Sequence, residues 1–135
     1  MPRFRTLQAA GALLLLVASC APMPATPTGA EDSRYLVYFN EFSAYLSPDA
    51  LNVITTASQR AKEVGAKTVL VQGRASATGS PVANQHLTET RTQVVYDALQ
   101  KDGVNPTIIR QQPLGQTTTT DTSVMDRRVD IVLFK

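Results

Sequence analysis

The sequence predicts an α/β (α+β) two-layer sandwich, in which two helices cover one face of a mixed β-sheet. Three features of the chain indicate this class. Strand-like runs and two helix-like segments follow one another in the order βαβαββ. Strands separated by a helix should run parallel, because a helical crossover returns the chain to the same end of the sheet. The last two strands are joined by a loop alone, so we expect them to run antiparallel.

The first strand and the first helix are expected between Leu36 and Gly65. Leu36 to Phe39 is a short apolar run of good β-formers. Ser47 can cap the free N–H groups of the following helix, and Pro48 suits its first position. The helix should end near Gly65 and should bury one stripe of its surface, which consists of Leu51, Ile54, Ala57, Ser58 and Ala61.

The second strand and the second helix follow in the same way. The run from Val69 to Val71 is apolar on both faces, which favours a central position in the sheet. Ser80 and Pro81 can begin the next helix, and Gly103 can end it. The inward stripe of this helix is expected to contain Leu87, Val94, Val95 and Ala98.

Two polar side chains share that stripe. At about 100° per residue, Asn84 and Arg91 fall on the same face as the apolar residues. A guanidinium that leaves water without a counter-charge costs several kcal/mol. We therefore expect an anionic group, from the protein or from a ligand, to meet Arg91.

The C-terminal part contains two further strands. Ile108 and Ile109 open the third strand, and Gln116 to Asp121, with its four consecutive Thr residues, is expected to be a loop. Arg127 to Phe134 has the alternation of a strand with one buried face. Its apolar side is Val129, Ile131 and Leu133, set against Arg128, Asp130 and Val132.

Residues 1–19 have the pattern of an export signal, with Arg3 and Arg5 before an apolar run that is too short to span a bilayer. The end of this segment, Val17-Ala18-Ser19-Cys20, resembles the lipobox of bacterial lipoproteins. This resemblance implies that Cys20 becomes the first residue of the mature protein. It would carry diacylglycerol on its sulfur and an acyl chain (palmitate) on its nitrogen, and more than one chain makes membrane attachment stable.

We expect residues 20–34 to be the lipidated Cys and a Pro/Thr-rich tether without apolar periodicity, and residues 35–135 to be the globular domain. The tether can reach about 40 Å at most. Ala21 rather than Asp follows Cys20, and the sorting rule of Gram-negative lipoproteins then implies the outer membrane, with the domain facing the periplasm.

The stretch from Gly73 to Arg91 resembles the signature of OmpA-like peptidoglycan-binding domains, G-H-T-D-x-x-G followed by N-x-x-L-S-x-x-R-A. The matching residues are Gly73, Gly79, Asn84, Leu87 and Arg91. The segment Asp126-Arg127-Arg128-Val129-Asp130-Ile131 resembles the family's N-R-R-V-E-I, and the likeness covers Tyr35 to Lys135. It implies the OmpA-like fold, which has this order of elements.

The resemblance also implies a ligand site. In the family, the loop Asp accepts the ammonium of diaminopimelate and the helix Arg takes its carboxylate. Here Ser76 stands in place of that Asp, and Arg74 in place of the His. We therefore expect weak binding of diaminopimelate-type stem peptides, or none, and a gain of about tenfold or more from Ser76→Asp. The expected ligand-binding residues are Arg91, Ser76, Asn84, Thr78 and Arg128.

Two alternatives stay open for this site. Arg91 could instead pair with a protein acid, Asp126, Asp130 or Glu41, and act only in the structure. Glu89 could replace the missing loop Asp as the acid that meets an ammonium.

Other classes of function are disfavoured. Without Arg3 and Arg5, 11 of the 13 Lys and Arg residues remain against 11 acidic residues, so no basic excess indicates nucleic acid. The single His, His86, falls off the apolar stripe of its helix and gives no catalytic or zinc-binding set, so we expect no enzyme, metal or cofactor. We expect a lipoprotein whose periplasmic domain contacts peptidoglycan. The alternative is a structural or protein-interaction subunit of an envelope assembly.

Overall fold

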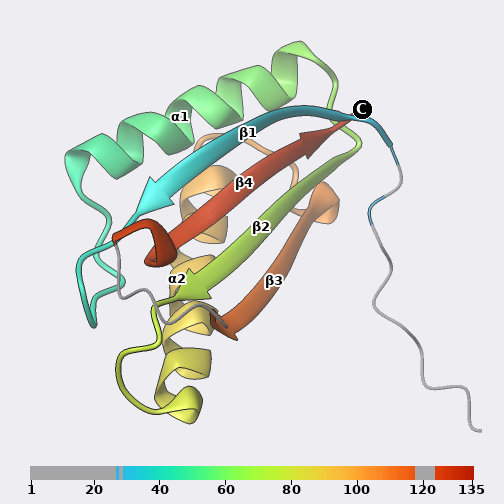
Figure 1. The fold of residues 1–135 in the computed structure, drawn as a ribbon. Helices are drawn as coiled ribbons and strands as arrows, with labels where there is room; N and C mark the ends of the chain where they lie inside the picture. The colour runs from blue at the N-terminus through green and yellow to red at the C-terminus, as the bar shows by residue number, and fades with distance from the viewer. Residues whose placement is uncertain (1–26, 28, 118–123) are drawn as a thin grey trace, which may run out of the picture.

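The structure, a computed structural model, describes residues 27, 29–117 and 124–135. Its elements, drawn in Figure 1, are β1 (Glu31–Tyr38), α1 (Pro48–Glu63), β2 (Thr68–Ala75), α2 (Pro81–Lys101), β3 (Ile109–Gln116) and β4 (Arg128–Phe134). Short 3₁₀ helices at Pro106–Ile108 and Val124–Asp126 precede the last two strands. The expected order βαβαββ is confirmed.

The four strands form one mixed sheet in the order β1-β4-β2-β3, and both helices lie on one face, behind the sheet in Figure 1. β2 pairs in parallel with β3, and β4 is antiparallel to both of its neighbours. This confirms the fold class and the central position of β2. β3 and β4 run in opposite directions as expected, but they do not pair. Instead β4 lies between β1 and β2 and pairs with both, which suits a strand whose apolar residues are buried.

Both helices begin as the sequence predicts. The Oγ atoms of Ser47 and Ser80 accept hydrogen bonds from the N–H groups of Ala50 (3.2 Å) and Ala83 (3.1 Å), and a Pro follows each cap. The stripe predicted for α1 is wrong at one position, because Leu51 is 45% exposed. Ala50 takes its place, one residue earlier, since it shares the helix face of Ile54, Ala57 and Ala61.

The buried face of α2 is more polar than expected. Asn84 and Arg91 do lie on it, together with Thr88, Thr92, Val95 and Leu99. Leu87, Val94 and Ala98 are only half-buried at its margins. Small β-branched side chains suit this face because α2 packs closely on β2. A Cβ added to Gly73 would lie 2.7 Å from Cγ2 of Thr92 and 3.0 Å from the carbonyl oxygen of Thr88. Gly73 therefore serves the contact between helix and strand.

β1 begins at Glu31 and takes in the last four residues of the predicted tether. Its early residues are fixed by pairing with β4 and by Asp32, which forms ion pairs with Arg60 (3.1 Å) and with Lys135. Gly29 also lies against the C-terminus, since a Cβ there would be 2.4 Å from the carbonyl oxygen of Lys135. The folded unit thus starts before residue 35.

Residues 1–19, Cys20 and most of the Thr-rich loop lie outside the described residues. Among the described residues, no helix has the length and apolarity needed to cross a bilayer.

Candidate functional site

A small cavity lies at the end of the sheet toward which β1 and β2 both point in Figure 1. The turn after β1 and the loop from β2 to α2 enclose it, and its volume of about 10 Å³ is near that needed for a single water. Its lining residues are Glu41, Phe42, Ala75, Ser76, Thr78, Asn84, Leu87, Arg91 and Arg127.

Arg91 lines the cavity and is the largest fully buried side chain among the described residues. Its Nε donates to the carbonyl oxygen of Ser43 (2.8 Å), and Nη2 donates to that of Asn40 (2.9 Å). A longer bond joins Nη1 to the carbonyl oxygen of Arg74 (3.4 Å), and the guanidinium carbon lies 5.0 Å from the ring centre of Phe39. A guanidinium has five N–H donors, so these three bonds leave two uncommitted.

Among the described residues, the charge of Arg91 has no acidic partner. In the described ranges no ion pair joins it to a carboxylate, so the expected alternative of a pair with Asp126, Asp130 or Glu41 is not what the structure contains. Burial, and next the nearby charge of Arg127, lower the pKa of Arg91 to about 10. The group is still cationic at neutral pH. Three carbonyl dipoles and the face of the Phe39 ring, but no described carboxylate, compensate this buried positive charge beside the cavity, which favours entry of an anion.

Asn84 holds the loop that forms the opposite wall. Its Nδ2 donates to the carbonyl oxygens of Ser76 (3.1 Å) and Thr78 (3.0 Å) and to Oε1 of Gln116 (3.2 Å). Ser76 is itself buried, with Oγ 3.4 Å from Oγ1 of Thr78. The structure thus brings Arg91, Ser76, Thr78 and Asn84 together, with Asn84 positioning the loop.

Comparison with known families agrees with this arrangement. Residues 38–128, more than half of the chain, match the OmpA family. The chain belongs to the OmpA family. The matched range contains both walls of the cavity, with the turn after β1 near its start and Arg127 at its end.

Among curated proteins, the chain is 32% identical over 103 residues to the probable lipoprotein YiaD of Escherichia coli (strain K12). The match covers 72% of this chain and 47% of YiaD, so the chain spans about half the length of that relative.

Three solved structures have a similar fold. The OmpA-like domain of FopA1 from Francisella tularensis subsp. tularensis SCHU S4 has a TM-score of 0.67 at 21% identity, covering 76% of this chain and 73% of that one. The peptidoglycan-associated lipoprotein of Burkholderia pseudomallei has a TM-score of 0.67 at 24% identity, and the match covers 73% of this chain and 89% of that one. The C-terminal domain of Helicobacter pylori MotB has a TM-score of 0.67 at 19% identity, and the match covers 74% of this chain and 84% of that one. At these identities the likeness concerns the fold alone.

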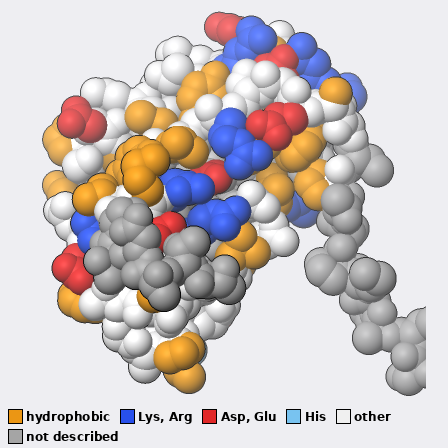
Figure 2. All heavy atoms as spheres, viewed as in Figure 1, with side chains coloured by type: hydrophobic (Ala, Val, Ile, Leu, Met, Phe, Trp, Pro, Cys, Tyr) orange, Lys and Arg blue, Asp and Glu red, His pale blue; other side chains and the backbone are white. Residues whose placement is uncertain are grey.

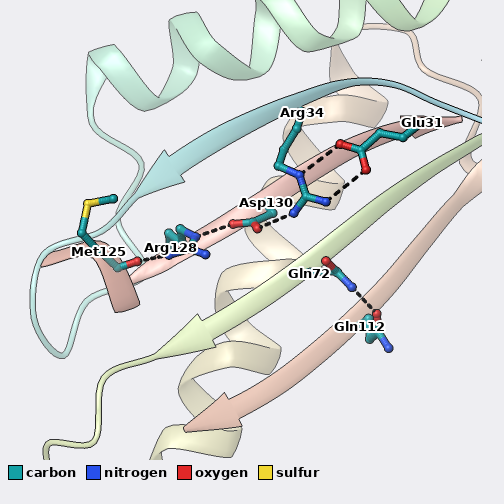
Figure 3. Close-up of polar contacts among 7 residues, drawn as sticks. All are labelled: Glu31, Arg34, Gln72, Gln112, Met125, Arg128 and Asp130. Atoms are coloured by element: carbon teal, nitrogen blue, oxygen red, sulfur yellow. Dashed lines mark hydrogen bonds and ion pairs between the residues drawn. The ribbon is translucent and has the colours of Figure 1, made fainter. Parts of the chain in front are cut away.

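Arg128, expected in the ligand site from the OmpA-family motif, lies elsewhere. Figure 3 shows it on the open face of the sheet, where Nε donates to Oδ1 of Asp130 (2.7 Å) and Nη1 donates to the carbonyl oxygen of Met125. The preceding Arg127 lines the cavity instead. Strand alternation explains the difference, because residue 127 shares the phase of buried Val129 and Ile131. Arg74 does not line the cavity either, since Gly73 beside it faces α2.

Two lining residues, Glu41 and Phe42, were not among the expected ligand-binding residues, although Glu41 was named as a possible partner of Arg91. They form the centre of a turn in which the N–H of Ser43 donates to the carbonyl oxygen of Asn40 (3.2 Å). Asn40 and Ser43 favour a turn here, but no Gly or Pro marks it, so the signal in the sequence is weak. The contact between Arg91 and this turn joins residues far apart in the sequence, so local sequence patterns do not reveal it.

Within the described ranges, no three His, Cys, Asp or Glu side chains are grouped to hold an ion. His86 is largely exposed as expected, with Nδ1 3.2 Å from Oε2 of Glu89.

Proposed function

We propose that this chain is a lipid-anchored envelope protein whose OmpA-family domain binds the carboxylate of a peptidoglycan stem peptide beside Arg91. The observation that carries the proposal is the buried guanidinium without an acidic partner, next to a cavity edged by Ser76 and Thr78. Charge-assisted bonds from the uncommitted N–H groups would favour a carboxylate there. The name of one structural relative, a peptidoglycan-associated lipoprotein, supports this ligand class.

The cavity as it stands has room for about one water, so a carboxylate enters only when its mouth opens. The opening that we propose is a change of rotamer at Phe42, which lines the cavity and is 67% exposed. We therefore expect binding to be weak, because opening the cavity costs free energy and Ser76 carries no charge.

A second candidate function has one observation in its favour. Arg91 already bonds three carbonyl oxygens and ties the turn Asn40–Ser43 to α2, as a purely structural residue would. In that case the domain is a protein-interaction or structural subunit of an envelope assembly.

Sedimentation with purified sacculi separates the two functions. We expect the protein lacking residues 1–20 to pellet with diaminopimelate-type sacculi, and we expect free stem peptide to suppress the pelleting. Arg91→Ala should abolish it, provided that thermal melting shows a folded variant. Arg110→Ala, at an exposed position of β3, is the matched control and should pellet normally. No pelleting of the unaltered chain would favour the interaction subunit.

The anchor has its own test. Cys20 lies outside the described residues, and the similarity to a probable lipoprotein supports its lipidation. Cys20→Ala should leave the domain folded and release it from membranes, because the apolar run before Cys20 is short. Fractionation of the outer membrane with detergent extraction measures this. A Cys20→Ala protein that still needs detergent for release would contradict the lipoprotein assignment.

A further inference from the structure

The turn Asn40–Ser43 is held by the same arginine that forms the base of the cavity. Arg91 donates to the carbonyl oxygens of both end residues, Asn40 and Ser43, while the N–H of Ser43 closes the turn. The two central residues, Glu41 and Phe42, are therefore presented at the cavity by its own buried cation.

The backbone of this turn is strained at one residue. Phe42 has a φ of 53°, in the left-handed region that Gly or Asn usually occupies at the third position of such a turn. Strain of this kind persists when surrounding contacts fix it, and it clusters at ligand-binding segments. Here the contacts are the two bonds from Arg91, and the strained residue lies on the cavity wall.

The charges around the cavity are of both signs. Arg91 and Arg127 line it, and they are close enough for the charge of Arg127 to affect Arg91. Glu41 supplies the one carboxylate among the lining residues. In the described part of the chain this carboxylate forms no hydrogen bond or ion pair, with either arginine or with any other residue. A cavity with separate, unpaired cationic and anionic groups is complementary to a zwitterion.

We propose that Glu41 is the acceptor for the ammonium group of a ligand whose carboxylate lies at Arg91, so that the cavity recognises an amino-acid zwitterion. This inference rests on the proposed function and assigns to Glu41 the charge that Ser76 lacks. The acid is contributed by the turn after β1 and not by the loop before α2, and the ligand class is a stem peptide that ends in a free α-amino acid group.

Glu89, the other acid that could replace the missing Asp, is not placed for this role. It lies on the exposed side of α2, where its oxygens bond Nε2 of Gln85 (3.1 Å) and Nδ1 of His86. It does not line the cavity. Glu89→Gln is therefore a matched control, with the same chemical change outside the site.

Calorimetric titration of residues 21–135 with a diaminopimelate-containing tripeptide stem tests the proposal. We expect Glu41→Gln to weaken binding by roughly ten- to a hundredfold and Glu89→Gln to leave it unchanged, because a charge-assisted bond to the ammonium is lost in the first variant alone. Adding Ser76→Asp to Glu41→Gln should restore affinity by supplying a carboxylate from the opposite wall.

A stem peptide acetylated on its side-chain amine tests the role of Glu41 separately from the binding of a carboxylate at Arg91. It keeps the carboxylate and loses the cation, so the unaltered chain and Glu41→Gln should bind it equally. Equal binding of the free zwitterion by both proteins would overturn the role of Glu41 and leave carboxylate binding at Arg91 intact. Absence of binding of either ligand by the unaltered chain would overturn both proposals.

Discussion

Two buried charges lie on opposite faces of the same sheet, and they are compensated differently. On the open face, Asp130 is 1% exposed and lies between Nη1 of Arg34 (3.1 Å) and Nε of Arg128 (2.7 Å), as Figure 3 shows. On the helix face, Arg91 is equally buried and meets carbonyl oxygens but no carboxylate. The acid has two opposite charges around it, and the cation has none.

The difference separates a structural cluster from a candidate site. A buried charge with its counter-charges in place gains little from a ligand, whereas a cation held by dipoles alone still favours an anion. The surroundings agree with this. Figure 2 shows Lys and Arg side chains gathered with acidic ones on the open face of the sheet. The helix face instead has a cavity at the end of Arg91.

The largest expected effect comes from separating α2 from the sheet. Gly73→Val would place side-chain atoms against Thr88 and Thr92, where even a Cβ is too close, and α2 carries Arg91. We expect a loss of roughly 2 to 3 kcal/mol in the free energy of unfolding, together with loss of ligand binding. Urea denaturation measures the first quantity.

Gln111→Val, at an exposed position of edge strand β3, is the control for Gly73→Val and should change stability little. Gly29 is unsuitable for this purpose, because it has a φ of 136° and lies against Lys135. Equal stability of the Gly73 and Gln111 variants would mean that helix–strand contact does not position Arg91.

Asp130→Asn should have a smaller effect, on stability alone. Removal of the acid leaves Arg34 and Arg128 without their shared partner, but both reach water, with 42% and 22% of their side chains exposed. We expect a loss of about 1 to 2 kcal/mol, below the cost for a fully buried pair. Ligand affinity should not change, since the cavity lies on the other face. A binding defect in this variant would show that the two faces are coupled.

The elements of the fold could be predicted because their signals are local. Ser47 and Ser80 mark helix starts through bonds that close within three residues. The place of β4 between β1 and β2 could not be predicted in this way, because strand order depends on contacts between distant parts of the chain. Leu51 was misplaced for a related reason, since a helix stripe read from the sequence is uncertain by one position at its edge.

Some residues of the candidate site could likewise be predicted from local patterns, and others could not. Arg91 was found because a polar residue interrupts a periodic apolar stripe. Arg127 could have been found, because it continues the alternation of Val129 and Ile131, but the neighbouring Arg128 was chosen from the motif. Glu41 was named from the sequence only as a possible partner of Arg91, and its place on the cavity wall could not be predicted, because it depends on a turn that Arg91 ties to a distant helix.

Asp32 gives the smallest expected effect and a pH dependence. The ammonium of Lys135, followed by Ser33 and Arg60, lowers the pKa of its carboxyl from 3.8 to about 2. Because this pKa is lower in the folded protein than in the unfolded chain, the ionised carboxylate stabilises the fold at every pH above its ordinary pKa of 3.8. This contribution is lost as the pH falls through about 2. The melting temperature of Asp32→Asn should therefore lie below that of the unaltered chain at pH 7, and the difference should vanish between about pH 4 and pH 2. A difference independent of pH would exclude the ion pairs as its cause.

The most direct test of Arg91 as an anion-binding residue uses one ligand in two forms. Residues 21–135 are titrated with a diaminopimelate-containing stem peptide and with the same peptide amidated at the side-chain carboxylate. We expect binding of the free carboxylate and a loss of roughly tenfold or more on amidation, because the charge-assisted bonds to the buried guanidinium disappear. Equal affinity for the two forms would show that Arg91 does not receive the carboxylate and that its burial serves the fold alone.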